Sequence, residues 1–184
     1  MADTYLSVVD SDDVVIGRQL RSIIHRDGLR HREVHVWFVT RKNEVVFQKR
    51  GPHKDTYPNC LDATAGGHVE EGQDYMQAAL AEVQEETGLS VPRHLLVPLG
   101  KVDVVQDDSA RGVVNRVYRM VYLYRFGGDV KDLQVENTDG AGFTAVPLLD
   151  VVNKQGGLVH QMVPGLFDPA YALVWRGIRD VLRL

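Results

Sequence analysis

The chain has 184 residues, 44% of them hydrophobic, and a formal net charge of −4, which is the size and composition of one globular domain. The negative charge and the lack of a Lys/Arg run argue against binding of a nucleic acid polymer. The single cysteine, Cys60, excludes an intrachain disulfide and favours the cytoplasm, and no apolar run approaches the roughly 18 residues of a membrane span. We expect one domain over 1–184 without a membrane segment.

The first half of the chain predicts strands separated by polar turns. β-Branched, aromatic and alternating runs mark the strands, and Lys42 and Asn43 supply the turn of a hairpin. The expected elements in order are strands over 5–10 and 14–16, one or two helical turns over 19–25, strands over 34–40 and 44–50, a loop over 51–59, and a segment over 61–65 that leads to two glycines.

The second half predicts one well-bounded helix and a further group of strands. Asp74 and Gln77 form a variant of the capping box, and Gly88 supplies a left-handed end, so a helix is expected between Asp74 and Gly88. After it come strands over 99–106, 113–126 and 140–146, a helical turn over 147–153 and a closing helix over 168–184. This order predicts a mixed α/β (α+β) fold in which helices cover both faces of a mixed sheet.

Three carboxylates share one face of the predicted helix. At ~100° per residue, Glu82, Glu85 and Glu86 lie within an arc of roughly 100°, beside an apolar arc. Like charges at this spacing destabilise a helix by about 0.2–0.5 kcal/mol per pair, so the cluster gains stability if a cation binds there. Magnesium, an oxygen-seeking ion, is the first candidate, and a merely solvated acidic face is the alternative.

The stretch GGHVEEGQDYMQAALAEVQEETGL resembles the signature of the Nudix hydrolases, G-(five residues)-E-(seven residues)-R-E-U-x-E-E-x-G-U, where U is bulky and aliphatic. The signature covers 67–89, and its matching positions are Gly67, Glu82, Val83, Glu85, Glu86, Gly88 and Leu89. Two positions depart, because Gln73 and Ala81 stand where the family has a Glu and an Arg that pair with each other. Replacement of both leaves no unpaired charge, although an orienting contact is lost.

The region before the signature resembles the Nudix branch related to type I isopentenyl-diphosphate isomerase. In that branch the catalytic Cys lies where this chain has Gly66, and a downstream acidic pair would fall within 114–116, which reads Val-Asn-Arg. A metal-binding His of the isomerase has its match in His31. Since the thiol and the acids are absent, hydrolysis is the stronger interpretation.

The resemblance implies a set of site residues and a cofactor. Glu82, Glu85, Glu86 and the Gly66 backbone would bind Mg²⁺ or Mn²⁺, and the catalytic base would be Glu82, Glu85 or the later acid Glu136. Substrate contacts are expected from Arg50 and Lys49, whose cationic heads suit phosphate, and from His68.

The expected activity is metal-dependent hydrolysis of a diphosphate linkage in a nucleoside diphosphate derivative or nucleotide, a small-molecule substrate, by a chain that forms a homodimer or acts as a monomer. A catalytically inactive Nudix domain that binds a nucleotide or a protein is the main alternative, and Gln73 and Ala81 motivate it. An isopentenyl-diphosphate isomerase is the third interpretation.

Overall fold

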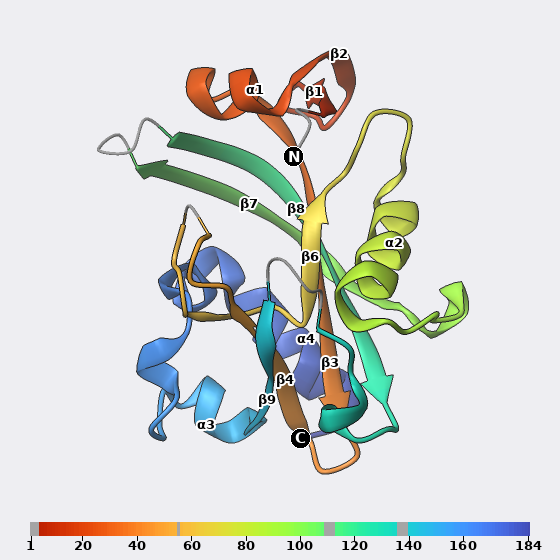
Figure 1. Cartoon of the computed structure of the whole chain (residues 1–184), viewed down its shortest axis with the longest axis vertical. Coiled ribbons are helices and arrows are strands. Elements are labelled where there is room, and N and C mark those ends of the chain that lie inside the picture. Colours follow the sequence, from red (N-terminus) through yellow and green to blue (C-terminus); the bar gives the residue numbers. More distant parts are fainter. Residues whose placement is uncertain (1–3, 55, 109–112, 136–139) are drawn as a thin grey trace.

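The computed structural model describes residues 4–54, 56–108, 113–135 and 140–184. Its helices are α1 (Arg21–Asp27), α2 (Tyr75–Thr87), α3 (Leu148–Val152) and α4 (Ala172–Leu182) (Figure 1). Its strands are β1 (Tyr5–Val9), β2 (Val15–Leu20), β3 (Arg30–Thr40), β4 (Glu44–Arg50), β5 (Leu61–Asp62), β6 (Ala65–His68), β7 (Val97–Asp108), β8 (Val113–Phe126) and β9 (Gly140–Pro147).

A mixed sheet forms the centre of the described part of the chain. Its main path runs β5-β4-β3-β8-β7, with β6 paired to β3 and β9 paired to β4. The middle strands β3 and β8 are parallel and stay in register from Arg30↔Arg116 to Thr40↔Phe126, whereas the other pairs are antiparallel. The turn between β3 and β4 places Asn43 at φ 59°, a left-handed conformation that Asn tolerates well.

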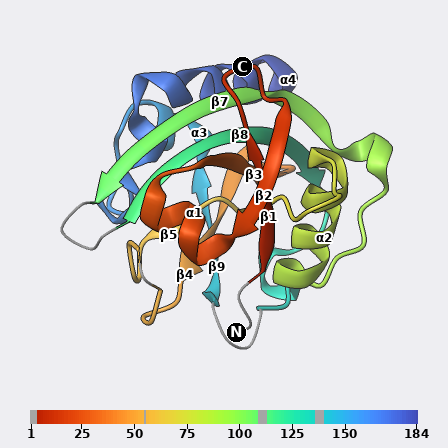
Figure 2. The same ribbon diagram turned by 90° about the horizontal axis from the view of Figure 1, so that it is seen from above.

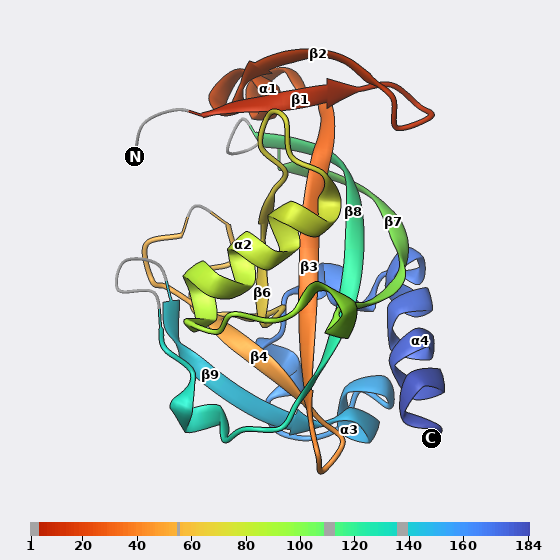
Figure 3. The same cartoon turned by 90° about the vertical axis from the view of Figure 1, so that its right-hand side faces the viewer.

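Helices cover both faces of this sheet. Along β3, Val34, Val36 and Phe38 point to the face on which α2 packs, where they meet Ala79 and Val83. The alternate positions of β3 point to the opposite face, which α3 and α4 cover. Figure 3 shows α2 and α4 on opposite sides of β3 and β8. The predicted mixed sheet between helices is confirmed.

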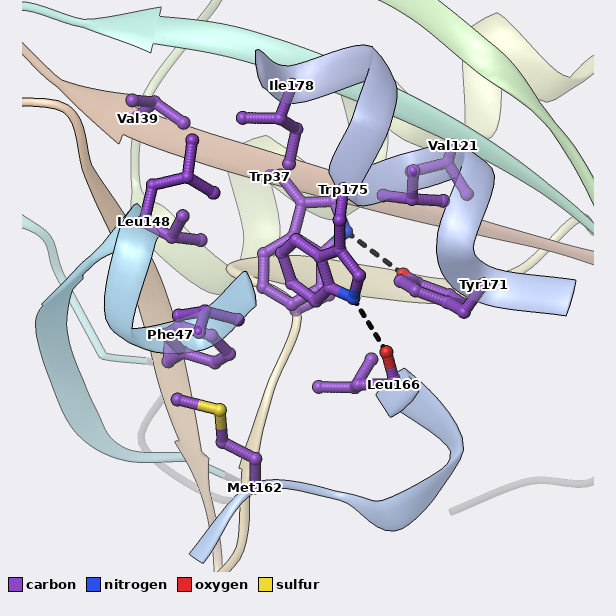
Figure 4. Close-up of a cluster of buried hydrophobic side chains, with 14 of the residues drawn as sticks. Trp37, Val39, Phe47, Val121, Leu148, Met162, Leu166, Tyr171, Trp175 and Ile178 are labelled. Atoms are coloured by element: carbon purple, nitrogen blue, oxygen red, sulfur yellow. Dashed lines mark hydrogen bonds between the residues drawn. The ribbon is translucent and has the colours of Figure 1, made fainter. Parts of the chain in front are cut away.

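The core under α4 is built around aromatic rings (Figure 4). The Trp37 and Trp175 rings lie 5.0 Å apart, and both are almost fully buried. Buried indole N–H groups need acceptors, and the two find them in the Tyr171 hydroxyl at 3.0 Å and the Leu166 carbonyl at 2.7 Å. These bonds fix the segment before α4 against the sheet.

The N-terminal strands form a unit of their own. β1 and β2 pair antiparallel in a separate sheet, and with α1 they lie at one end of the molecule (Figures 1 and 2). This unit contacts the loop between β6 and α2, because Leu6 bridges Glu70 and the Glu71 N–H donates to the Tyr5 carbonyl at 3.2 Å. The N-terminal unit therefore braces the loop that precedes α2.

Most predicted elements are present, with shifted ends. The strands predicted over 44–50 and 113–126 are β4 and β8 with the same bounds. The closing helix predicted from residue 168 is wrong at its start, because Pro169–Tyr171 is a 3-10 turn and α4 begins at Ala172. Similarly, the segment predicted over 61–65 is divided into β5 and β6. In the described residues, no helix is long and apolar enough to cross a membrane.

Candidate metal and hydrolase site

Helix α2 is held at both ends by its own sequence. The Asp74 carboxylate accepts from the Gln77 N–H at 2.7 Å, and the Gln77 side chain accepts from the Asp74 N–H at 2.8 Å, which completes a capping box. At the other end Gly88 takes φ 72° and its N–H donates to the Gln84 carbonyl. The predicted caps are confirmed, and they fix which side chains of α2 face β6.

Two of the three predicted metal ligands meet the glycines of β6. The Gly66 N–H donates to Glu86 Oε2 at 2.9 Å, which orients this carboxylate. A Cβ atom built on Gly67 would lie 2.0 Å from Glu82 Oε1, so the space over Gly67 is filled by the Glu82 carboxylate. Only a residue without a side chain leaves that space open. Glu85, on the same side of the helix, is exposed.

The residues present fit a divalent metal ion with oxygen ligands. Carboxylate oxygens suit Mg²⁺, which binds proteins through one or two carboxylates and keeps several waters. Glu82 and Glu86 are half-buried against backbone, while Glu85 opens to solvent, where water and phosphate oxygens have access.

The loop before α2 accommodates the departure at position 73. The Glu70 N–H donates to Gln73 Oε1 at 3.1 Å, so the carboxamide oxygen closes the loop on itself. Glu71 is paired with Arg18 at 2.7 Å, which ties the loop to β2. Ala81 is half-buried on α2. Gln73 therefore supports the loop through a neutral acceptor.

Of the other predicted site residues, Arg50 and His68 have polar partners among the described residues. Arg50 donates to the Thr56 carbonyl at 3.0 Å and to Asp62 at 3.0 Å, so its guanidinium is held by the loop 51–59 and by β5. Lys49 is exposed on β4. Glu136 lies outside the described residues. His68 faces His25, whose Nε2 lies 3.1 Å from His68 Nε2, and its contact with substrate stays a prediction.

A row of polar side chains lies on the face of β3 that points away from α2. His31, Glu33 and His35 occupy alternate positions, and all three are buried. The His35 ring nitrogen Nδ1 lies 2.9 Å from the Tyr171 hydroxyl, and burial lowers the pKa of His35 to about 3, so this ring is neutral at pH 7.

A buried ion pair links β3 to β8. Arg119 donates to Glu33 Oε2 from Nη2 at 2.7 Å and from Nε at 3.1 Å. Burial by itself raises the pKa of the Glu33 carboxyl, but Arg119, His68 and His31 together outweigh burial, so the pKa lies below its ordinary value. Glu33 is therefore ionised, with its second oxygen, Oε1, turned toward His68 at 3.5 Å.

Three histidines from separate elements converge beside Glu33. His25, His31 and His68 each offer a ring nitrogen, and these atoms lie within 4.8 Å of one another. Burial lowers the pKa of His25 to about 4 and that of His68 to about 3, and it lowers the pKa of His31 as well. The contacts of His31 and His68 with Glu33 therefore join neutral rings to a carboxylate at neutral pH.

Sequence reasoning singled out His31 and His68 but missed Glu33 and the buried polar group as a whole, although a signal for it exists. In the apolar run of β3, polar residues recur at every second position from His31 to His35, which places them on one strand face. Their partners, Arg119 and Tyr171, come from distant parts of the chain. No local pattern marks those two residues.

Comparisons with known proteins agree with this geometry. The family described as NUDIX domain matches residues 29–162. An uncharacterized Nudix hydrolase of Streptomyces coelicolor is 34% identical over 96% of this chain and 92% of its own length, and one of Clostridium acetobutylicum is 25% identical over 97% and 85%.

Among solved structures, a protein of Deinococcus radiodurans is similar with a TM-score of 0.63, 21% identity, and coverage of 85% of this chain and 95% of that one. The NUDIX domain of NrtR from Shewanella oneidensis, solved with ADP ribose, is similar with a TM-score of 0.55, 15% identity, and coverage of 82% and 86%. These two likenesses bear on the fold. With the family match over most of its length and a full-length relative at 34% identity, this chain belongs to the NUDIX domain family.

Proposed function

We propose that this chain is a Mg²⁺- or Mn²⁺-dependent diphosphohydrolase that cleaves a diphosphate linkage in a nucleoside diphosphate derivative. The observation that carries the proposal is the meeting of α2 with β6, where Glu86 accepts from the Gly66 N–H and Glu82 fills the space over Gly67. The proposed ligands are these two carboxylates, Glu85 and the Gly66 backbone. Nudix relatives that are named hydrolases support the reaction class.

The carboxylates have separate roles in the proposal. When bound, the metal ion would neutralise the diphosphate and lower the pKa of a coordinated water. The Gly66 N–H keeps Glu86 in one orientation through its hydrogen bond. The Glu82 carboxylate packs against the Gly67 backbone, in the space that a side chain at position 67 would fill. Glu82 or the exposed Glu85 would take the proton of the attacking water. Glu136, the third candidate base, stays a sequence-based proposal.

The substrate class rests on electrostatics and on the relatives. A diphosphate is an anion, and Lys49 presents an exposed ammonium group on β4 beside Arg50. Arg50 is held by Thr56 and Asp62, so it would contact phosphate only with the donors that these bonds leave. The similar NUDIX domain of NrtR was solved with ADP ribose, a nucleoside diphosphate linked to a sugar, which supports a small-molecule substrate of this class.

A screen tests this proposal directly. Nucleoside diphosphates, triphosphates and diphospho-conjugates are incubated with the protein and Mg²⁺ or Mn²⁺, and phosphate release is measured, with a phosphatase added for conjugates. At least one substrate should be turned over in a metal-dependent manner. Absence of turnover for every compound with both metals would overturn the proposed activity.

A binding module without turnover is the second candidate, and the departures at Gln73 and Ala81 favour it. Metal titration by calorimetry, combined with the same screen, separates the two functions. Tight binding of a nucleotide without hydrolysis would support the binding module.

Three further proposals concern organisation. Residues 1–184 would act as one Nudix domain, and the single cysteine favours the cytoplasm. A homodimer is the third, and light scattering coupled to size-exclusion chromatography tests it by giving the mass in solution.

A further inference from the structure

The N-terminal unit lies against the helix that carries the proposed metal ligands, although it precedes the segment that matches the family. β1, β2 and α1 all end before residue 29, where the NUDIX domain match begins. Figure 3 shows the loop that enters α2 rising to β1, and the bridge Leu6↔Glu70 joins the two. The start of α2 is therefore within reach of side chains from the N-terminal unit.

The turn between β1 and β2 presents one carboxylate, that of Asp13. Asp10 Oδ1 accepts from the N–H groups of Asp12 and Val14, both at 2.9 Å, and the Asp13 N–H donates to the Asp10 carbonyl at 3.2 Å. Asp13 takes φ 62°, a left-handed conformation that Asp adopts more readily than most residues. Its side chain is only 10% exposed. The turn thus holds the Asp13 carboxylate against the body of the protein.

The Asp13 carboxylate joins the turn to three other elements. Asp13 Oδ2 accepts from the Tyr75 hydroxyl at 2.9 Å and from Lys101 Nζ. Asp13 Oδ1 accepts from Arg32 Nε at 2.6 Å. Tyr75 is the first residue of α2, Arg32 lies on β3 and Lys101 lies on β7. Hydrogen bonds to an ionised acceptor are roughly twice as strong as neutral ones, so this carboxylate is a firm link between the N-terminal unit and α2.

Charge balance around Tyr75 depends on Asp13. Arg32 Cζ and Lys101 Nζ lie 5.2 and 5.5 Å from the centroid of the Tyr75 ring, which is the range of cation–π contacts. Burial by itself raises the pKa of the Asp13 carboxyl, but hydrogen bonds from its three donors, led by Lys101, outweigh burial, so the pKa is lowered. Asp13 is therefore ionised at pH 7. Without its charge, two cations would share the side of Tyr75 with no counter-ion.

The other ion pair between the N-terminal unit and this region is much weaker. Arg18 and Glu71 are 2.7 Å apart, but their side chains are 60% and 42% exposed. Exposed pairs contribute little because water screens them. Asp13 is thus the stronger of the two ionic links.

The position of Tyr75 bears on the metal ligands through the helix itself. Glu82 lies seven residues after Tyr75, which is about two turns and about 10 Å along α2. A hydrogen-bonded helix moves as one body, so a tilt at its first residue displaces Glu82 and Glu86 relative to the β6 glycines. Metal–ligand distances tolerate only about 0.2 Å, so a small tilt weakens metal binding.

We propose that Asp13 is a positioning residue, through which the N-terminal unit fixes the start of α2 and so the carboxylates of Glu82 and Glu86. The proposal rests on the metal-dependent hydrolysis proposed above. It gives residues outside the matched segment a part in that reaction without contact with the substrate.

The Mg²⁺ dependence of hydrolysis by Asp13→Asn tests the proposal. Asparagine keeps the size of the side chain and removes the charge. Groups that orient metal ligands cost ~10–100-fold when removed, and Asp13 acts one step further away, so half-maximal activity should need at least roughly fivefold more Mg²⁺. At saturating Mg²⁺, kcat and the KM for substrate should change less than the Mg²⁺ requirement does. A residue that only stabilised the fold would lower the melting temperature and leave the Mg²⁺ requirement of the folded protein unchanged.

Two further variants serve as control and as a test of the route. Asp12→Asn removes an exposed carboxylate from the same turn and should behave as the wild type. Tyr75→Phe removes only the hydroxyl that donates to Asp13, so it should also raise the Mg²⁺ requirement. If Asp13 acts through Tyr75, the double variant should need less Mg²⁺ than the product of the two single effects predicts.

Binding of Mn²⁺ gives a readout that does not depend on turnover. Bound Mn²⁺ is measured by electron paramagnetic resonance, and Glu86→Gln identifies the ion held by α2 as the one that this variant loses. Asp13→Asn should bind that ion at least roughly fivefold more weakly than the wild type. This result in a wild type without turnover would support the positioning role while it refutes the hydrolase.

Two results would overturn the proposal and leave the proposed hydrolase intact. One is a folded Asp13→Asn variant with the Mg²⁺ requirement and the Mn²⁺ affinity of the wild type. The other is a Tyr75→Phe variant with wild-type values for both, which would remove the route from Asp13 to α2.

Discussion

Substitution of Gly67 by Ala should disable the magnesium site while it leaves the fold intact. The new Cβ would lie 2.0 Å from Glu82 Oε1 and 2.4 Å from Glu82 Cδ, whereas ordinary contacts begin at 3.4 Å. Since β6 is fixed by its pairing with β3, the carboxylate of Glu82 has to move away by about 1.4 Å. Metal–oxygen distances tolerate only ~0.2 Å, so Glu82 would no longer bind an ion held by Glu86.

The expected magnitudes follow from this displacement. Groups that merely orient metal ligands cost ~10–100-fold in metal affinity or activity when they are removed, and displacement of a ligand should cost at least as much. The stability cost should lie near the lower end of the ~1–3 kcal/mol typical of overpacking, because the end of the Glu82 side chain is half-buried and has room to turn outward.

The assay is the Mg²⁺ dependence of substrate hydrolysis, measured for the wild type, Gly67→Ala and Gly17→Ala. Gly17 is the matched control, because a Cβ there would meet nothing within 4 Å. Half-maximal activity of Gly67→Ala should need at least tenfold more Mg²⁺, and Gly17→Ala should behave as the wild type. Wild-type Mg²⁺ dependence in a folded Gly67→Ala protein would refute the assignment of Glu82 as a ligand.

Three further predictions concern the buried polar face of β3. Tyr171→Phe should lower the free energy of unfolding by about 1–3 kcal/mol in urea, because it leaves the Trp37 N–H without its acceptor; a loss below about 0.5 kcal/mol would contradict this. Arg119→Met should lower the free energy of unfolding by about 3–5 kcal/mol, since it leaves the buried Glu33 carboxylate unpaired. Adding Glu33→Gln should recover part of this loss. If the losses of the two single variants simply add in the double variant, the two residues do not stabilise each other. The depressed pKa of His35, about 3, means that only the unfolded chain takes up a proton as the pH falls from about 6.5, so stability present at pH 7 is lost toward pH 3. His35 alone should lower the free energy of unfolding by about 2 kcal/mol between pH 7 and pH 5. His35→Asn should therefore show a shallower pH dependence of the free energy of unfolding. Identical pH dependence in the wild type and His35→Asn would show that His35 is not responsible.

Elements whose limits depend on nearby residues could be predicted from the sequence. Asp74, Gln77 and Gly88 fix α2 through hydrogen bonds within a few residues, so its caps were correct. The start of α4 could not be predicted, because the turn at Pro169–Tyr171 is held by the distant Trp37 and the sheet. The separate sheet of β1 and β2 likewise depends on which partner each strand finds, which alternation does not encode.

The candidate site divides in the same way. Glu82, Glu85 and Glu86 share one side of a helix because of helical periodicity, so their grouping is visible in the sequence. The histidine cluster needs a left-handed turn at Gly28, the β3 and β6 register and the N-terminal unit together. The sequence alone therefore does not show that these histidines lie close together.

The most direct test of the account is metal-dependent hydrolysis by Glu86→Gln, compared with wild type at saturating Mg²⁺ and with a substrate found in the screen. Glutamine keeps the size of the side chain and an oxygen that can accept from the Gly66 N–H, but it removes the negative charge. Glu86→Gln should fold, and its turnover should fall by at least roughly 100-fold. Near-normal turnover in Glu86→Gln would contradict a metal-dependent hydrolase centred on α2.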